Sequence, residues 1–149
     1  MNYVRQQISP ARVVFVAVFA LIILVSVAKV SKGTGVIGKE DLAGSWQATL
    51  VGDTGCGAGT IVVDFTLNSS GTGPATLHGH SGCGNTTTSG QTFTVTTMNT
   101  NGSGTAGVSC GPACGFTFSI QVAPDRAVFN MADITDPIPN ALAGVAIHQ

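Results

Sequence analysis

The sequence has few charged side chains, and most of its basic residues lie near the N-terminus. Only 9% of the 149 residues are Asp, Glu, Lys or Arg, against roughly 25% in an average soluble protein. From Asp41 onward, Arg126 is the one basic side chain against six aspartates, which gives this region a net charge of −5. Proteins that bind nucleic acid gather Lys and Arg against the phosphates. The composition therefore excludes a nucleic-acid partner, and solubility must depend on Thr, Ser and Asn.

A helical period is also missing. After Lys39, no stretch of a dozen residues repeats its apolar side chains with the period of an α-helix. Short apolar and threonine-rich runs instead alternate with clusters of Gly, Asn, Ser and Pro, which is typical of strands joined by turns. The pattern predicts an all-β domain with strands at Ser45–Val51, Thr60–Leu67, Thr72–His80, Gln91–Met98, Ser103–Cys110, Gly115–Val122, Arg126–Asp133 and Ala141–His148.

Two of the expected hairpins share an N-x-x-G turn, at Asn68–Gly71 and at Asn99–Gly102. This pattern suits a type I turn whose last residue is a left-handed glycine that forms a bulge. In the first hairpin, the turn predicts Phe65 opposite Ala75, which pairs apolar with apolar. The same turn does not align the apolar side chains of the second hairpin, so its register stays open.

The third tight connection is Pro124-Asp125, where proline sets φ at the second position of a type I turn. A two-residue turn here predicts Ile120 opposite Phe129. The longer connections are expected at the other end of the sheet, at Gly52–Gly59, Ser81–Gly90, Cys110–Cys114 and Asp133–Asn140.

The N-terminal part reads as a targeting segment. Arg5 and Arg12 precede a charge-free apolar run from Val13 to Ala28, which ends in small residues suited to cleavage. Residues 1–28 are therefore a signal peptide or, if uncleaved, a hydrophobic helix that anchors the chain in a membrane. Residues 29–41 are expected to be a flexible linker, and residues 42–149 the barrel domain. The protein is accordingly expected to be exported: secreted, periplasmic or held at the cell surface.

The four cysteines all fall in the connections at one end of the expected sheet. An even number of cysteines in an exported domain favours disulfides over a zinc site or a redox motif. We favour Cys110 bonded to Cys114 as a small ring, and Cys56 bonded to Cys83 across two connections. The spacing alone allows all three pairings.

The start of the first strand resembles a known family. Gly44-Ser45-Trp46 matches the G-x-W signature of the calycins, which include lipocalins and avidins, and the resemblance implies that the Trp plugs the closed end of an eight-stranded barrel. It also implies an up-and-down antiparallel topology; an antiparallel β-sandwich is the alternative. No Arg follows Arg126 to pack on Trp46 as in lipocalins, and one Trp is too few for an avidin-like biotin site.

Aromatic side chains at inward strand positions are predicted to form the core of the barrel. Such a core can be filled, or it can line a cavity for a ligand. The predicted ligand-binding residues are Trp46, Phe65, Phe93, Phe118 and Phe129. The predicted ligand is small and apolar, and it enters at the end that carries the cysteines.

Other polar groups give weaker signals. His78 and His80 share the outer face of one strand near Asp64, and Asp133, Asp136 and Asn140 share a loop. The H-x-H spacing occurs in metal sites, but these histidines lie on an outer, polar face, and the aspartates lack the spacing of a dedicated calcium loop. We therefore interpret both groups as solvated surface; a weak metal site of His78 and His80 with Asp64 is the alternative. No nucleophile with a base can be placed on neighbouring strands, so we expect no enzyme and no cofactor. The protein is predicted to be a binding module, or alternatively a surface or adhesion module without an internal ligand.

Overall fold

The computed structural model describes residues 35–111, 114–135 and 141–149; the side chains of residues 110, 111 and 114 are not described. Residues 35–149 make up one compact unit. The predicted signal peptide or anchor at residues 1–28 lies outside the described residues. Within the described part of the chain, no helix is long and apolar enough to cross a bilayer.

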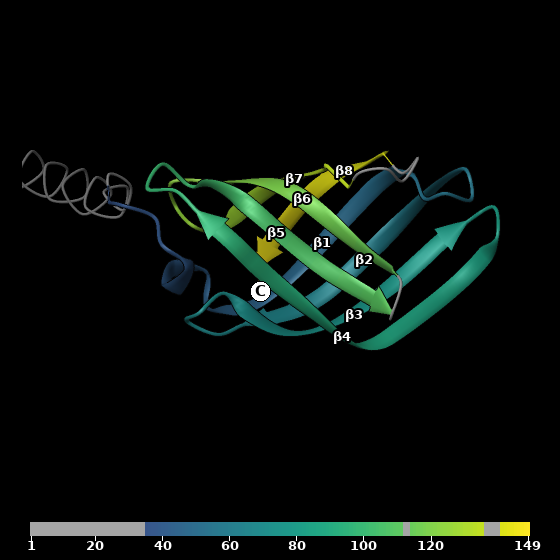
Figure 1. Cartoon of the computed structure of the whole chain (residues 1–149), viewed down its shortest axis with the longest axis horizontal. Coiled ribbons are helices and arrows are strands. Elements are labelled where there is room, and N and C mark those ends of the chain that lie inside the picture. The colour runs from purple at the N-terminus through teal and green to yellow at the C-terminus, as the bar shows by residue number, and fades with distance from the viewer. Residues whose placement is uncertain (1–34, 112–113, 136–140) are drawn as a thin grey trace, which may run out of the picture. The chain divides into compact units, whose positions relative to one another are not determined.

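Eight antiparallel strands close into a barrel in which each strand lies beside its neighbours in the sequence (Figure 1). The strands are β1 (Gly44–Asp53), β2 (Ala58–Leu67), β3 (Thr72–Ser81), β4 (Gly84–Met98), β5 (Ser103–Gly111), β6 (Cys114–Val122), β7 (Val128–Asp133) and β8 (Ala141–His148). The first and last strands pair from Trp46 opposite His148 to Asp53 opposite Ala141. This closure confirms the barrel and rules out the sandwich, which would leave these two edges open.

The strands alternate buried and exposed side chains because one face of the sheet is turned inward. In β2, Ile61, Val63, Phe65 and Leu67 are buried, whereas Thr60 and Thr66 are exposed. The first hairpin has the predicted register, with Phe65 opposite Ala75. The apolar half of each strand therefore lines one continuous core.

The predicted register of the β6–β7 hairpin is wrong by two residues. Phe129 lies opposite Val122, and Met131 lies opposite Ile120. The connection is longer than a two-residue turn: Ala123 N donates to Val128 O, and Arg126 takes a left-handed conformation with φ of 60°. Only glycine adopts this region without a steric cost. Because an arginine stands here instead of a glycine, the sequence did not indicate the longer loop.

The open register of the β4–β5 hairpin is resolved by a bulge. The ladder skips one residue between Val95 and Thr97, so that Val95 lies opposite Ala106 and Phe93 lies opposite Val108. The extra residue, Thr96, shifts the apolar side chains of the two strands into alignment.

Two of the connections expected to be long are shorter than predicted. The β1–β2 ladder continues to Asp53 opposite Ala58, and the β3–β4 ladder continues to Ser81 opposite Gly84, so the predicted loop at Ser81–Gly90 is largely the first part of β4. The three threonines that follow Asn85 supply the β-branched side chains that favour a strand. Gly84 and Gly90, both at positive φ, bound this part of β4.

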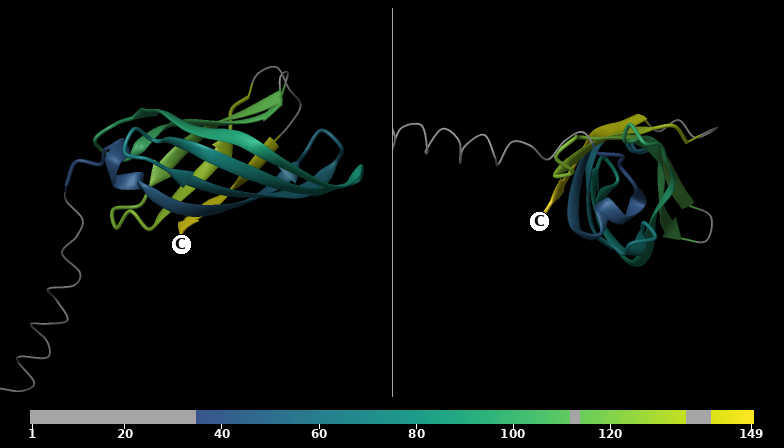
Figure 2. Two further views of the ribbon diagram at one scale, coloured as in Figure 1. Left: turned by 90° about the horizontal axis from the view of Figure 1, so that it is seen from below. Right: turned by 90° about the vertical axis from the view of Figure 1, so that its left-hand side faces the viewer.

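The end of the barrel near Trp46 is closed by the chain that precedes β1. A short 3-10 helix, η1 (Lys39–Leu42), lies inside the ring of strands at this end, which we call the floor (Figure 2). Leu42 is fully buried, and Trp46 Nε1 donates a hydrogen bond to Leu42 O at 2.8 Å. Ile37 is also buried, and its N–H donates to Thr100 O. Residues 35–41, expected to belong to a flexible linker, therefore pack on the barrel.

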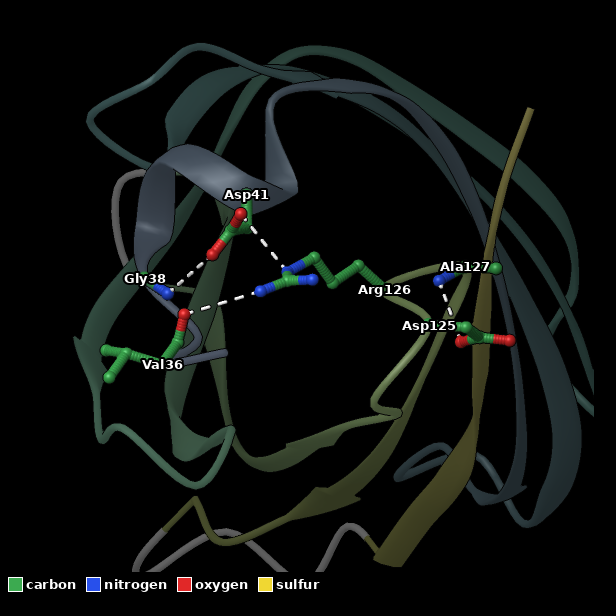
Figure 3. Close-up of polar contacts among 6 residues, drawn as sticks. All are labelled: Val36, Gly38, Asp41, Asp125, Arg126 and Ala127. Carbon is green, nitrogen blue, oxygen red and sulfur yellow. Dashed lines mark hydrogen bonds and ion pairs between the residues drawn. The ribbon is translucent and has the colours of Figure 1, made fainter. Parts of the chain in front are cut away.

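Arg126 holds this segment in place across the floor (Figure 3). Its Nε lies 3.1 Å from Asp41 Oδ1, off the line of a hydrogen bond, and its Nη2 donates to Val36 O at 3.4 Å. Asp41 in turn accepts a hydrogen bond from Gly38 N at 2.9 Å. Both side chains of the ion pair are less than a third exposed, at 23% and 29%, so water screens the pair only partly.

We expect the Arg126–Asp41 pair to contribute about 1 kcal/mol to the free energy of unfolding. Each single substitution should cost more than the coupling, because Asp41→Ala also removes the acceptor for Gly38 N and Arg126→Ala also removes the donor to Val36 O. A double-mutant cycle by urea denaturation measures the coupling. A coupling energy of zero would show that the ion pair does not stabilise η1, which would then be held by its other contacts with the barrel.

Candidate functional site

The two ends of the barrel differ in what closes them. At the floor, three hairpin turns and η1 surround Trp46. At the other end, which we call the rim, lie the β1–β2 turn at residues 54–57 and the β3–β4 turn at residues 82–83. The rim connections at residues 112–113 and 136–140 lie outside the described residues.

A disulfide joins two of the rim turns. Cys56 in the β1–β2 turn is bonded to Cys83 in the β3–β4 turn, with their Cα atoms 5.7 Å apart. This confirms the pairing that the sequence favoured among three. The predicted Cys110–Cys114 ring depends on side chains outside the described residues.

The five predicted ligand-binding residues lie together in the barrel interior. Trp46 and Phe129 have ring centroids 4.9 Å apart, Phe65 stacks on Phe93 at 4.1 Å, and Phe65 meets Phe129 edge-on at 6.3 Å. Phe118 lies 6.1 Å from Phe116. The alternation of the strands explains why all five point inward, as expected.

The rings leave no free space around themselves. Phe93, Phe118 and Phe129 are 0% exposed, so no space large enough for a water molecule adjoins them. Trp46 and Phe65 are exposed by only 1% and 4%. These aromatic side chains form a packed core in this conformation, and a ligand in contact with them must displace at least one ring.

A second layer of apolar side chains lies between the aromatic core and the rim. Ile61 and Leu77 are exposed by 7% and 6%, more than most of the core, and Phe116 is half-buried. These residues were not among the predicted ligand contacts, although the alternation of β2 and β3 also placed Ile61 and Leu77 inward. No polar or charged residue of the described chain is buried. Apart from the indole N–H of Trp46, which is bonded to Leu42 O, the side chains of the described interior offer apolar contact only.

The outer wall has a shallow hollow of about 350 Å³ beside the C-terminus. The final residue continues the pairing of β8 with β1, where Gln149 N donates to Ser45 O. The hollow is lined by Ser45, Trp46, Asp64, Phe65, Thr66, Pro74, Ala75, Thr76 and Gln149. Most of its polar groups are hydroxyl, amide or carboxylate groups at outward strand positions.

The two histidines lie on the outer wall, as predicted. His78 Nε2 lies 3.4 Å from Asp64 Oδ2, its Nδ1 contacts Thr87 Oγ1 at 3.2 Å, and His80 Nδ1 contacts Asn85 Oδ1. His78 and Asp64 are each nearly half exposed. Among the described residues, no three His, Cys, Asp or Glu side chains are grouped closely enough to share a metal ion.

Asp133 is the one described member of the predicted aspartate loop. Its Oδ1 accepts a hydrogen bond from Thr135 N at 2.8 Å. The carboxylate therefore stabilises the start of the β7–β8 connection. Asp136 and Asn140 lie outside the described residues.

Comparison of the sequence with protein-family models and with curated proteins finds no match. The likeness to the calycins accordingly rests on the closed eight-stranded up-and-down barrel and on Trp46 at its floor. A barrel of this kind is a scaffold for many functions, so the fold by itself names no ligand.

Removing the rim disulfide should lower the free energy of unfolding by about 3 kcal/mol, because the bond closes a loop of 27 residues in the unfolded chain. The test is urea denaturation of the double variant Cys56→Ser, Cys83→Ser against the oxidised protein. The far-UV circular dichroism spectrum should stay the same, since the strands pair independently of the bond. A loss below about 1 kcal/mol would show that the turns are held by other contacts.

Proposed function

We propose that the protein is an exported, non-catalytic binding module whose small apolar ligand enters the barrel at the rim. The observation that carries the proposal is the asymmetry of the barrel: η1 and Trp46 close one end, and the rim carries the cross-linked turns. A closed floor converts a barrel into a cup with one opening. Disulfides persist in oxidising compartments, which supports export.

The chemistry of the interior supports an apolar ligand. The described core is made of aliphatic and aromatic side chains without a buried polar partner. A polar ligand would lose its hydrogen bonds to water there and gain none, at a cost of roughly 1–3 kcal/mol for each group. An alkyl chain or a ring loses nothing on transfer and gains contact.

The layer of Ile61, Leu77 and Phe116 is the first apolar surface that a ligand meets inside the rim. Contact deeper in the barrel, with Trp46, Phe65, Phe93, Phe118 and Phe129, requires rotation of packed rings. We therefore propose that binding begins on the rim-side layer and that the aromatic core adjusts to the ligand. Trp46, the only tryptophan in the chain, reports such a change.

Binding is tested by titrating the protein with dodecanol while the fluorescence of Trp46 is recorded. A saturable change is expected, together with a bound species in the native mass spectrum that is absent from the denatured one. A flat titration and a bare native mass would overturn the proposal.

A matched pair of variants locates the site. Leu77 points inward and His78, its neighbour in the chain, points outward. Leu77→Trp should fill the space inside the rim and weaken dodecanol binding by about tenfold or more. His78→Trp adds the same side chain to the outer wall and should leave the binding unchanged. Equal binding by both variants would place the site elsewhere.

A second candidate function is a surface or adhesion module that contacts glycans. The hollow beside Gln149 favours it, because hydroxyl, carboxylate and amide groups gather there around Pro74. Such groups suit the hydroxyls of a sugar. Thr66→Trp would fill this hollow without touching the interior, so loss of binding to immobilised oligosaccharides in this variant alone would favour the second function.

A further inference from the structure

The strand β4 is the longest in the barrel and is paired on both sides along only part of its length. It has 15 residues. Its ladder with β3 runs from Thr94 to Gly84, whereas its ladder with β5 covers only Phe93 to Met98. The segment Gly84–Gln91 therefore has no ladder partner on its β5 side among the described residues. Figures 1 and 2 show this hairpin running past the end of β5.

A side chain ends the ladder between β4 and β5. Ser109 Oγ accepts a hydrogen bond from Thr92 N at 3.1 Å and donates to Gln91 Oε1 at 3.3 Å. Ser109 thus satisfies the last backbone donor of the paired part of β4. Beyond this point the ladder between β4 and β5 ends, and no strand that the structure describes pairs with this edge of β4.

The register identifies the open backbone groups. Ser81 and Gly84 are a ladder pair separated by two residues, so they exchange both backbone hydrogen bonds. Along an antiparallel ladder, hydrogen-bonded and non-bonded pairs alternate. Asn85 and Thr87 are in non-bonded positions relative to His80 and His78. Their N–H and C=O groups consequently point away from β3, toward the open edge.

This edge carries neither of the side-chain types that most directly prevent strands from adding to one another. Proteins protect exposed edges with charged side chains or proline. The sequence holds no charged residue between Asp64 and Asp125, and no proline between Pro74 and Pro112. Asn85, Thr86 and Thr87 are exposed, and the one irregularity is the bulge that precedes Gln91. An open backbone edge of this kind is complementary to another extended strand.

The order of residues in the segment points to one partner. Residues 84–90 read Gly-Asn-Thr-Thr-Thr-Ser-Gly, which is nearly the same in both directions. We propose that this edge pairs with the same edge of a second copy of the chain, antiparallel and with the twofold axis at Thr87. Gly84 then lies opposite Gly90, Asn85 opposite Ser89, and Thr86 opposite Thr88 of the other copy.

The pairing satisfies the open groups and uses contacts that the barrel already contains. The two copies of Thr87 exchange both backbone hydrogen bonds, since each presents its N–H and C=O to the other. Thr86 faces Thr88 of the other copy, as Thr72 faces Thr94 and Thr97 faces Thr105 within the barrel, with hydroxyl distances of 2.9 and 2.8 Å. A twofold contact closes on itself, so the assembly stops at a dimer. Because the paired segment is short, we expect a dissociation constant on the order of 10⁻⁵ M.

Sedimentation equilibrium of the full chain tests the dimer. Thr87→Pro removes the N–H that the second copy needs and spares the ladder with β3, because that ladder does not use it. This variant should weaken association by about tenfold or more. Thr87→Val keeps the N–H and should dimerise like the original protein. A monomeric original protein at about 0.5 mM, or equal association by the proline and valine variants, would overturn the proposal.

Cross-linking gives a test that does not depend on how the proline variant folds. Residues opposite each other in a hydrogen-bonded pair have Cα atoms about 5.5 Å apart, within the range that a disulfide spans. Thr87→Cys should therefore form a covalent dimer on mild oxidation, visible on a non-reducing gel. Thr66→Cys, an exposed position on β2, should stay monomeric. Equal cross-linking at both positions, or none at Thr87→Cys, would contradict the twofold pairing.

Discussion

The ladder between β1 and β8 is the contact on which the other features of the domain depend. It joins the two ends of the chain's meander, from Trp46 opposite His148 to Asp53 opposite Ala141, and it turns a curved sheet into a barrel with an inside. Once the sheet is closed, the inward positions of all strands face one another, and Trp46 can pack against Phe129 from the far part of the chain. Without this ladder the apolar side chains would face solvent, and both terminal strands would expose open edges.

Closure also gives the barrel two unlike ends. The segment before β1 folds back inside the ring, and Arg126, Leu42 and Trp46 keep it there. The opposite end carries the Cys56–Cys83 bond and the β3–β4 hairpin, whose second strand runs past the ladder with β5. The same strand alternation that fills the interior leaves an outer wall rich in hydroxyl and amide side chains, with exposed aliphatic side chains at Val51, Val145 and Ile147 on β1 and β8.

The number and positions of the strands could be predicted because side-chain alternation is a local property. Phe65 opposite Ala75 followed from an N-x-x-G turn, whose glycine supplies a left-handed conformation at no steric cost. The β6–β7 register could not be predicted in this way, because Arg126 takes a left-handed backbone conformation in which glycine is the usual residue. The bulge at Thr96 and the strand that begins before Asn85 could not be predicted either. Both depend on how the neighbouring strand pairs, which the local sequence does not determine.

The sequence by itself determined the fold class, the inward set of aromatic residues and the rim position of Cys56 and Cys83. Side-chain alternation, the residues that favour turns and the alternation of connections between the two ends of the sheet can all be read over short stretches of chain. The tertiary structure alone decided that β1 and β8 meet, that residues 35–41 seal the floor, and that the aromatic side chains pack without free space. It also decided that one edge of β4 stays open. These outcomes depend on contacts between residues far apart in the chain, whose fit follows from the size and curvature of the closed barrel.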